Sequence, residues 1–538
     1  MESHHALKTL EEPPSPKDNG NNKMNQRPVT TSKRLVYNSV LNVATLVTHA
    51  IVGFFLIRFF LVQLGEVRYG IWVLIGGSMF RYAPLLSMGL NSAVNRYIPL
   101  YLAKNDADGI QRVVNTSLFF FMILATVLVI ASLVIYYHVG SWFAIEPEWV
   151  KIAGALVLIV GFCIALAMPL QPSTAILSGL QRYDLINFAT LAILLLRTVL
   201  IVLLLLQNHG LLTMGLVFSL SEIVVRMWHS VYVRRLLPAV SLSFSKIDFR
   251  LLKEMIPYGI NSFLYATGAI LIYHASSLII GVFIGAAEIS QFTVASAGVL
   301  LLSQLLGAFT GAIKPAVSDL DARDDHATVK EIALLTQKYS LLLIIPSACF
   351  LIAMGREFLY VWVSDRFTDP TIIDKMAVIL TILTVGHCFR LAQHSNFLVL
   401  VGRGQHRIFA VLTVLTAVLC VLSSIISVKV FNQGLVGIAW SNFLPLVLVS
   451  GVILPIYFNW KMHISTLENA LNVWLPALLG SLPATSMIVV WKYLAPPDSW
   501  LEIGGVIFAG MILTFAGGWF LGLTKLEQKR FARMIRKK

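Results

Sequence analysis

The chain has 538 residues, of which 57% are hydrophobic and only 13% charged, and its mean hydropathy is +0.78. Soluble globular domains carry about 25% charged residues, so the composition excludes that class. The hydrophobic runs have helix length and predict an all-α membrane protein, because a bilayer admits only helices or closed barrels. The net charge of +14 is compatible with nucleic-acid binding. Lys and Arg gather between the hydrophobic runs, however, which is the pattern that orients membrane proteins, so we expect no nucleic-acid partner.

The chain begins with a polar stretch, EEPPSPKDNGNN, which predicts a disordered tail. No apolar run precedes Leu35, so we expect no cleaved signal peptide. From there we count about fourteen membrane-spanning helices. Their predicted ranges are 35–62, 70–97, 114–137, 150–177, 184–207, 211–234, 256–284, 288–313, 338–355, 375–401, 407–430, 434–459, 473–494 and 501–523.

Short strings recur in the same order in two halves of the chain. LSGLQRYDLINF (177–188) parallels LVGRGQHRIFAV (400–411), and NHGLLTMGL (208–216) parallels NQGLVGIAW (432–440). Each copy holds an even number of spans, so both copies share one topology. This predicts two parallel six-helix repeats around a central cavity, followed by two extra C-terminal helices. Most of the Lys and Arg residues fall on the side of the two tails, which predicts that both termini are cytoplasmic.

The predicted division follows from these repeats. It comprises a disordered cytoplasmic tail (1–34), an N-terminal six-helix bundle (35–235), an amphipathic cytoplasmic linker (236–255), a C-terminal six-helix bundle (256–461), helices 13 and 14 (462–523) and a basic cytoplasmic tail (524–538). Within the linker region, FSKIDFRLLKEMIPYG (244–259) predicts a short helix on the membrane surface, because apolar residues recur at helical spacing. Ser245 and Asp248 form an S-x-x-D signal for its start.

Basic side chains outnumber acidic ones inside the predicted spans. The basic residues are Arg58, Arg81, Arg197, Arg226, Arg390, His49, His274, His387 and His394. Glu222 is the one carboxylate well inside a span, and its i, i+4 spacing to Arg226 predicts an ion pair or a coupling site. Four arginines then lack an evident carboxylate, and Arg58 lies near enough to a span end to reach the membrane surface. Intramembrane charges usually face a bundle interior, so the set predicts an anion-attracting cavity.

Two stripes of polar residues point to the walls of that cavity. His387, Arg390 and His394 are spaced i, i+3 and i+7, which places them on one helical face, and the matching part of the first copy has no basic residue. On the first span, Asn38, Asn42, Thr45 and His49 also share one face. Helix packing through small and polar residues is the alternative explanation for such stripes.

No catalytic or metal-binding motif occurs in the chain. Cys163, Cys349, Cys388 and Cys420 lie within predicted spans without C-x-x-C spacing, which indicates core residues and not disulfides or metal ligands. We expect no cofactor. An integral-membrane glycosyl polymerase or ligase would favour large extracytoplasmic loops, and the predicted loops are short. The sequence therefore predicts that the protein is not an enzyme.

Three strings resemble a known family. LGEVRYGIWVL (64–74) and LLSMGLNSAVNRYI (85–98) resemble the first two helices of polysaccharide and O-antigen flippases, and LSGLQRYDLINF resembles the loop after their fourth helix. These flippases belong to the multidrug/oligosaccharidyl-lipid/polysaccharide exporter (MOP) superfamily. Relatives often carry an acidic residue just before the Gly-Leu of helix two, where this chain has Ser87 and Met88. The ion-coupling role of that acidic residue is therefore not transferred to this chain.

The resemblance implies a flippase that works by alternating access in the cell inner membrane. Its implied cargo is an undecaprenyl-diphosphate-linked sugar, moved from the inner to the outer leaflet, with membrane lipids and polysaccharide polymerase or glycosyltransferase machinery as implied partners. The arginines inside the predicted spans support this cargo independently of the resemblance, because arginine donates bidentate hydrogen bonds to phosphate. The candidate substrate-binding residues are Arg81, Arg197, His387, Arg390, His394, Asn38, Asn42 and His49.

Three alternatives remain open at this point. A drug or cation antiporter of the same superfamily would need buried carboxylates, and Glu222 alone is available. A lipid II flippase would also have a cationic interior, so the sequence separates it poorly from the first hypothesis. A non-transporting membrane scaffold would use its polar residues for packing only, and its arginines would be individually replaceable.

Overall fold

The computed structural model describes residues 31–238, 241, 243–367 and 369–529, and within these ranges it is all-helical. Thirteen helices in this part of the chain are long and apolar enough to cross a membrane. Large apolar side chains such as Leu166, Phe188 and Phe508 point outward, as a surface facing lipid requires. The all-α membrane fold predicted from the sequence is confirmed. Most of the tail predicted at 1–34 lies outside the described residues, and α1 begins at Thr31.

The helices of the first half precede residue 237. They are α1 (Thr31–Ile71), α2 (Ser78–Tyr82), α3 (Leu90–Ala103), α4 (Ala107–Trp142), α5 (Pro147–Ala167), α6 (Gln171–Gly179), α7 (Tyr183–Leu206) and α8 (Leu211–Leu236).

The helices of the second half follow the linker. They are α9 (Phe249–Phe283), α10 (Ala286–Thr310), α11 (Ile313–Asp321), α12 (His326–Ala353), α13 (Gly355–Val363), α14 (Pro370–Ala392), α15 (His394–Gly402), α16 (Arg407–Lys429), α17 (Gly434–Leu446), α18 (Leu454–Lys461), α19 (Thr466–Asn469), α20 (Leu475–Leu494) and α21 (Trp500–Gly517).

A glycine reverses the chain between the first two predicted spans. Gly65 has φ 79° and ψ 172°, a conformation that side chains rarely adopt, and it interrupts the helical run that ends at Ile71. The apolar run Leu41–Ser87 therefore contains residues 41–62 of the first predicted span and the start of the second, which α3 completes. With this division, the thirteen runs account for the fourteen spans predicted from the sequence.

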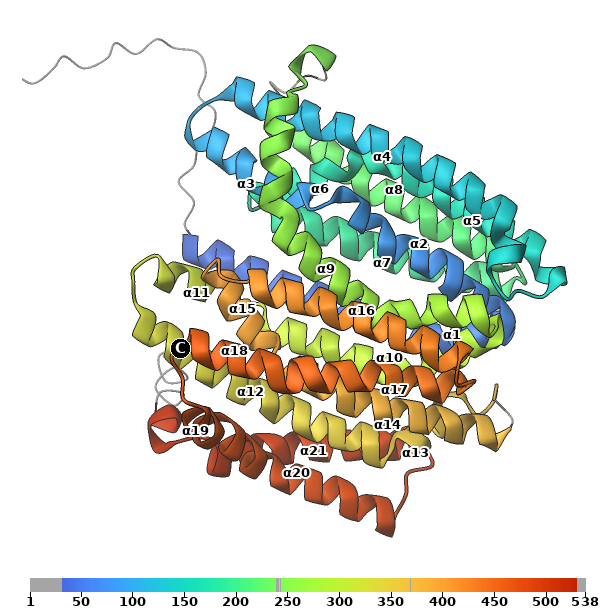
Figure 1. Cartoon of the computed structure of the whole chain (residues 1–538), viewed down its shortest axis with the longest axis vertical. Helices are drawn as coiled ribbons and strands as arrows, with labels where there is room; N and C mark the ends of the chain where they lie inside the picture. Colours follow the sequence, from blue (N-terminus) through green and yellow to red (C-terminus); the bar gives the residue numbers. More distant parts are fainter. Residues whose placement is uncertain (1–30, 239–240, 242, 368, 530–538) are drawn as a thin grey trace, which may run out of the picture.

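The helices form two groups, and α9 runs between them. Figure 1 shows α4, α5, α7 and α8 along one side of the molecule and α12, α14, α17 and α20 along the other. Helix α9 contacts α3 and α4 in the first group and α16 and α17 in the second, and α1 contacts both α7 and α10. The polar cavity predicted between the halves would thus be bordered by α1 and α9. The division into two six-helix bundles at the predicted boundaries stays a prediction.

The predicted linker helix is continuous with the following span. Phe244–Lys246 forms a single 3-10 turn, and α9 then runs from Phe249 to Phe283 without interruption. Asp248 caps this helix by accepting hydrogen bonds from the backbone N–H groups of Arg250 (2.9 Å) and Leu251 (3.0 Å). Of the predicted signal only Asp248 is used, as the cap of the spanning helix, whereas Ser245 lies in the preceding 3-10 turn. The predicted boundary at residue 255 falls inside α9.

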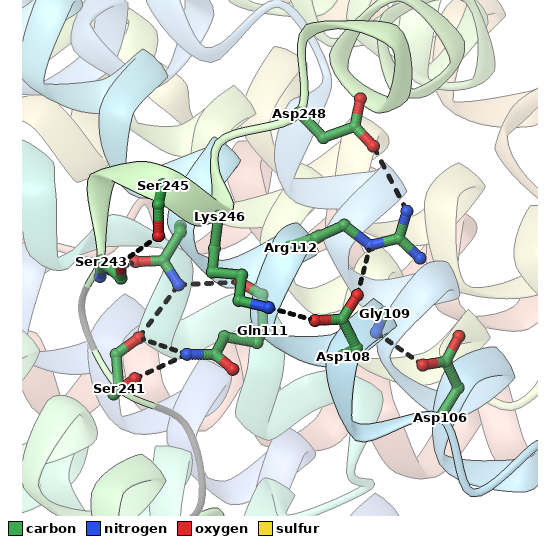
Figure 2. A network of polar contacts seen from close by, with 11 residues as sticks. Asp106, Asp108, Gly109, Gln111, Arg112, Ser241, Ser243, Ser245, Lys246 and Asp248 are labelled. Carbon is green, nitrogen blue, oxygen red and sulfur yellow. Dashed lines mark hydrogen bonds and ion pairs between the residues drawn. The ribbon is translucent and has the colours of Figure 1, made fainter.

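Polar contacts bind the linker to the start of α4 (Figure 2). Asn115, which is buried, donates to Ser241 O (3.0 Å) and accepts from Ser243 N (2.8 Å), so its side chain pairs with the linker backbone. Lys246 Nζ lies 2.6 Å from Asp108 Oδ1. Arg112 Nη1 lies 3.4 Å from Asp248 Oδ2. These contacts attach the segment that joins the two halves to the first half.

The Asp248 cap gives a testable stability effect. The hydrogen bond from the backbone N–H of Leu251 contributes most to holding the pKa of Asp248 below its usual value. The backbone N–H of Arg250 and the guanidinium of Arg112 lower it further. Its stabilisation is therefore complete above the unfolded pKa of about 3.9 and is lost as the pH falls through the lower folded value. Asp248→Ala should cost about 1 kcal/mol at pH 7, because alanine cannot cap. Thermal unfolding of the purified protein at pH 7 and pH 3 measures both effects.

Asp248→Asn is the matched variant, because asparagine caps helices as well as aspartate but does not titrate. We expect it to keep most of the stability at pH 7 and to lose less than the wild type between pH 7 and pH 3. Equal stability of the alanine and asparagine variants at pH 7 would contradict a capping role for Asp248.

Candidate functional site

A central cavity of about 250 Å³ lies between helices of the two halves. Its walls come from α1, α2, α8, α9, α10, α14 and α17. The polar residues on these walls include His49, Arg81, Tyr273, His274, Ser296, Gln304, His387 and Asn442. No carboxylate of the described residues lines this cavity. Three of the predicted residues, His49, Arg81 and His387, are thus brought together from three helices that are far apart in the sequence.

Arg81 is the one arginine among the described residues on this wall. It lies in the last turn of α2, just before the 3-10 turn Ala83–Ser87. Its guanidinium lies against the preceding turn, since a Cβ added at Gly77 would be 3.2 Å from Arg81 Nη1. Its polar neighbours are the hydroxyl groups of Tyr69 and Tyr82, and no carboxylate in the described part of the chain is paired with it. Arg81 therefore faces the cavity as an uncompensated positive charge.

Tyr273 connects two further predicted residues. The ring of His387 stacks on the ring of Tyr273, with centroids 4.9 Å apart and an interplanar angle of 20°. The guanidinium carbon of Arg390 lies 5.4 Å from the centre of the same ring, a cation–π arrangement. Tyr273 also donates a hydrogen bond to Ser303 Oγ (3.0 Å). His387 thus faces the cavity, whereas Arg390 contacts the wall through Tyr273.

Tyr273, His274 and Asn442 line the cavity but were not among the predicted site residues. No helical spacing singled out Tyr273, because a position eight residues after Tyr265 lies about 80° around α9 from it. Asn442 belongs to α17, and its side chain donates to Ser276 Oγ on α9 (3.1 Å). No sequence signal links Asn442 to α9, because that contact arises only when the helices pack.

A second cavity of about 200 Å³ lies within the first half, between α1, α6, α7 and α8. Glu222 stands at its centre: Oε1 lies 3.3 Å from Arg197 Nη1, and Oε2 lies 3.0 Å from Arg226 Nη1. Arg226 Nε also donates to Gln171 Oε1 (2.7 Å). His49 is the one residue that lines both cavities. The predicted Glu222–Arg226 pair is present, and Arg197 joins it.

The expectation that four arginines lack a carboxylate is wrong for two of them. Arg197 shares Glu222 with Arg226. Arg58 pairs with Asp365 at 3.4 Å on the surface, where both side chains are exposed. The sequence count missed these pairs because one carboxylate has two oxygens and can serve two arginines, and because Asp365 lies outside the predicted spans. Within the described residues, Arg81 and Arg390 remain without a carboxylate partner.

His394 and Asn42 are not among the residues that line the two cavities. Helix α14 ends at Ala392 and α15 begins at His394, so the predicted stripe is interrupted and His394 lines neither cavity. Asn42 accepts a hydrogen bond of 2.5 Å from Asn187 Nδ2, which fixes α1 to α7. The side chain of Asn38 lies outside the described part. All four cysteines are free.

Comparison with known proteins places this architecture in a family. A family described as polysaccharide biosynthesis protein matches residues 85–371, which is more than half of the chain. The chain belongs to this family. Among proteins with curated annotation, no sequence matches. The match confirms the polysaccharide-biosynthesis family to which the sequence resemblance pointed.

Solved structures of MOP-superfamily transporters share the fold of this polysaccharide biosynthesis protein. The lipid II flippase MurJ, in an inward closed conformation, is similar over 90% of this chain and 97% of its own, with 16% identity and a TM-score of 0.62. An inward-facing multidrug resistance MATE family transporter is similar over 79% and 94%, with 15% identity and a TM-score of 0.60.

A third structure is that of a MOP-superfamily transporter from Pyrococcus furiosus, described as having a binding pocket of reverse polarity. It covers 80% of this chain and 95% of its own, with 15% identity and a TM-score of 0.59. At these identities the likeness establishes the fold and leaves the cargo open. The neighbours are described as transporters and as a flippase.

Proposed function

We propose that the protein is a flippase for an anionic, polyprenyl-diphosphate-linked oligosaccharide, which it moves from the inner to the outer leaflet for polysaccharide export. The observation that carries this proposal is the charge of the central cavity. Arg81, together with His49, His274 and His387, lines it, and no described carboxylate does. An unpaired positive charge inside a membrane protein is unfavourable unless something neutralises it, and an anionic headgroup is a suitable partner.

The chemistry of Arg81 fits a diphosphate. A guanidinium presents N–H groups in a fixed fork that matches two phosphate oxygens, and such charge-assisted bonds are stronger than neutral ones. The histidines and Tyr273 add hydrogen-bonding groups for the headgroup, while the polyprenyl tail would stay in lipid. An inside-negative membrane potential favours outward movement of an anion by about 2.3 kcal/mol per charge per 100 mV.

The proposed transport cycle is alternating access between the two halves. Helices α1 and α9 contact both helix groups and border the cavity, so a change in their packing would open it toward one side or the other. Under this proposal both termini are cytoplasmic, the protein resides in the inner membrane, and the linker attached to α4 lies on the cytoplasmic side. Polysaccharide polymerase or glycosyltransferase machinery would act before and after it.

A cation or drug antiporter is disfavoured by the same observation. Such a transporter needs a carboxylate to attract its cargo or to exchange a proton or sodium ion, and Glu222 is already shared by two arginines in the other cavity. A lipid II flippase carries a cargo with the same diphosphate chemistry. The transport experiment below distinguishes this alternative from the proposed function.

The test reconstitutes the full-length protein in liposomes with three cargoes. They are a fluorescent polyprenyl-diphosphate oligosaccharide, fluorescent lipid II and a cationic dye. We expect movement of the first, measured by its exposure to a membrane-impermeant quencher, at a rate well above that for lipid II and without dye transport. A higher rate for lipid II would show that lipid II, and not the proposed oligosaccharide, is the cargo. Dye transport without lipid movement would overturn the flippase function.

A further inference from the structure

The second cavity, whose walls come from the first half alone, has an unbalanced charge. Two guanidinium groups, those of Arg197 and Arg226, share the single carboxylate of Glu222. The side chains of Arg197 and Arg226 are 13% and 22% exposed, so water screens them only partly. The pairing leaves one surplus positive charge in a cavity of about 200 Å³. At this depth an uncompensated charge is costly unless an anion accompanies it.

The hydrogen-bond donors around this charge are also incompletely used. Arg197 directs only Nη1 to protein groups, at 3.3 Å from both Ser221 Oγ and Glu222 Oε1. Its Nε and Nη2 have no hydrogen-bonded acceptor among the described residues. Phe218 covers one face of this guanidinium, 4.1 Å from the ring centre, which holds its plane in place. A guanidinium carries five N–H donors, so several remain free for a ligand.

Other groups near the surplus charge are donors as well. Gln171 uses its Oε1 to accept from Arg226 Nε (2.7 Å), which leaves its Nε2 amide group as a donor. Thr174 Oγ1 and His229 Nδ1 lie 2.9 Å apart and satisfy each other. Apart from Glu222, the ionisable side chains on this wall are basic: His49, Arg197, Arg226 and His229. The free groups are therefore suited to an acceptor-rich ligand.

We propose that the cavity bordered by Arg197, Glu222 and Arg226 binds a small inorganic anion, either a halide or a tetrahedral oxyanion. The site is distinct from the cavity assigned to the lipid-linked cargo, because His49 is the only described residue common to the two walls. Its volume of about 200 Å³ is enough for a hydrated inorganic anion. The inference holds whichever lipid-linked cargo the protein carries.

The test measures anion binding to the purified full-length protein in detergent. Gluconate, a bulky organic anion, serves as the background anion at constant ionic strength, and chloride or inorganic phosphate is titrated while the thermal unfolding midpoint is recorded. We expect a saturable rise of the midpoint with at least one of the two anions. Comparison of the two titrations distinguishes a halide site from an oxyanion site. A midpoint that does not respond to either anion would overturn the proposal.

Two substitutions should change the affinity in opposite directions. Arg197→Gln removes the surplus charge and should weaken binding at least about tenfold, since a charge-assisted hydrogen bond contributes that much or more. Glu222→Gln raises the surplus to two and should strengthen binding, even if it lowers stability in gluconate. A purely structural ion-pair role would lower stability in both variants without moving the anion affinity in opposite directions.

Arg81→Gln is the matched control, because it removes an arginine from the central cavity and leaves the second cavity intact. The anion response should persist in this variant. If it instead disappears in Arg81→Gln and persists in Arg197→Gln, the anion binds in the central cavity and the proposed site is wrong. An unchanged affinity in Glu222→Gln would also count against it.

Discussion

Arg81→Gln is expected to reduce flipping of the diphosphate-linked cargo by at least tenfold, with normal amounts of protein in the membrane. Arg81 is the one described arginine that lines the central cavity, and no described carboxylate neutralises it. A hydrogen bond to a charged group contributes about 1.5–3 kcal/mol, which corresponds to roughly tenfold or more in rate when it is lost at the binding step. The rate in the liposome assay and the amount of reconstituted protein are the two measurements.

Two variants separate charge from geometry. Arg81→Lys keeps the charge but loses the planar fork, so we expect an intermediate rate. Arg58→Gln removes an arginine that pairs with Asp365 at the surface, where ion pairs contribute little, and it should flip cargo normally. Wild-type rates in Arg81→Gln would show that the cavity charge is not used for the cargo.

Gly259→Val is expected to remove most of the folded protein from the membrane. Helix α9 approaches the junction before α3 so closely that a Cβ at Gly259 would lie 2.3 Å from Gly89 O. The clash is with backbone, so no side-chain rotation relieves it. Gly89 itself has φ +81°, where residues other than glycine are strained. Overpacking of this kind costs about 1–3 kcal/mol and sometimes more.

Gly504→Val provides the matched control for this prediction. The same substitution is made in a helix, but no heavy atom outside the local backbone of that helix lies within 4 Å of a Cβ at Gly504. We expect this variant to accumulate and unfold like the wild type, as judged by immunoblot and by thermal unfolding in detergent. Comparable abundance of the two valine variants would mean that α9 does not pack against the first half as closely as described.

The membrane-spanning helices followed from hydropathy alone, because a lipid-facing helix must be apolar along its whole length. The predicted span 407–430 corresponds to α16 (Arg407–Lys429), and 434–459 to the run Gly434–Lys461. The linker was less predictable. Its apolar spacing and its Asp248 cap were recognised, yet these features suit either a separate surface helix or the first turns of α9. Only the contacts with α3 and α4 decide between the two.

The candidate site was predicted in part, for a definable physical reason. An intramembrane arginine or histidine is conspicuous in the sequence, since its insertion is costly, and this identified Arg81, His49 and His387 as residues that meet in one cavity. Tyr273 and Asn442 escaped notice because aromatic and amide side chains are ordinary in membrane helices. Whether such a side chain lines the cavity depends on the helix that it faces in the folded protein.

The sequence by itself determined the class of protein, the positions of its spans and the excess of basic over acidic groups inside the membrane. These properties depend on residue type and order along a single helix, because each helix must by itself be apolar enough to lie in the bilayer. Only the tertiary structure decided which charges are neutralised. It assigned Arg197 and Arg226 to Glu222, placed Arg81 in the central cavity with no carboxylate partner among the described residues, and interrupted the stripe before His394. Electrostatic pairing depends on distances between helices, and no spacing along the chain encodes those distances.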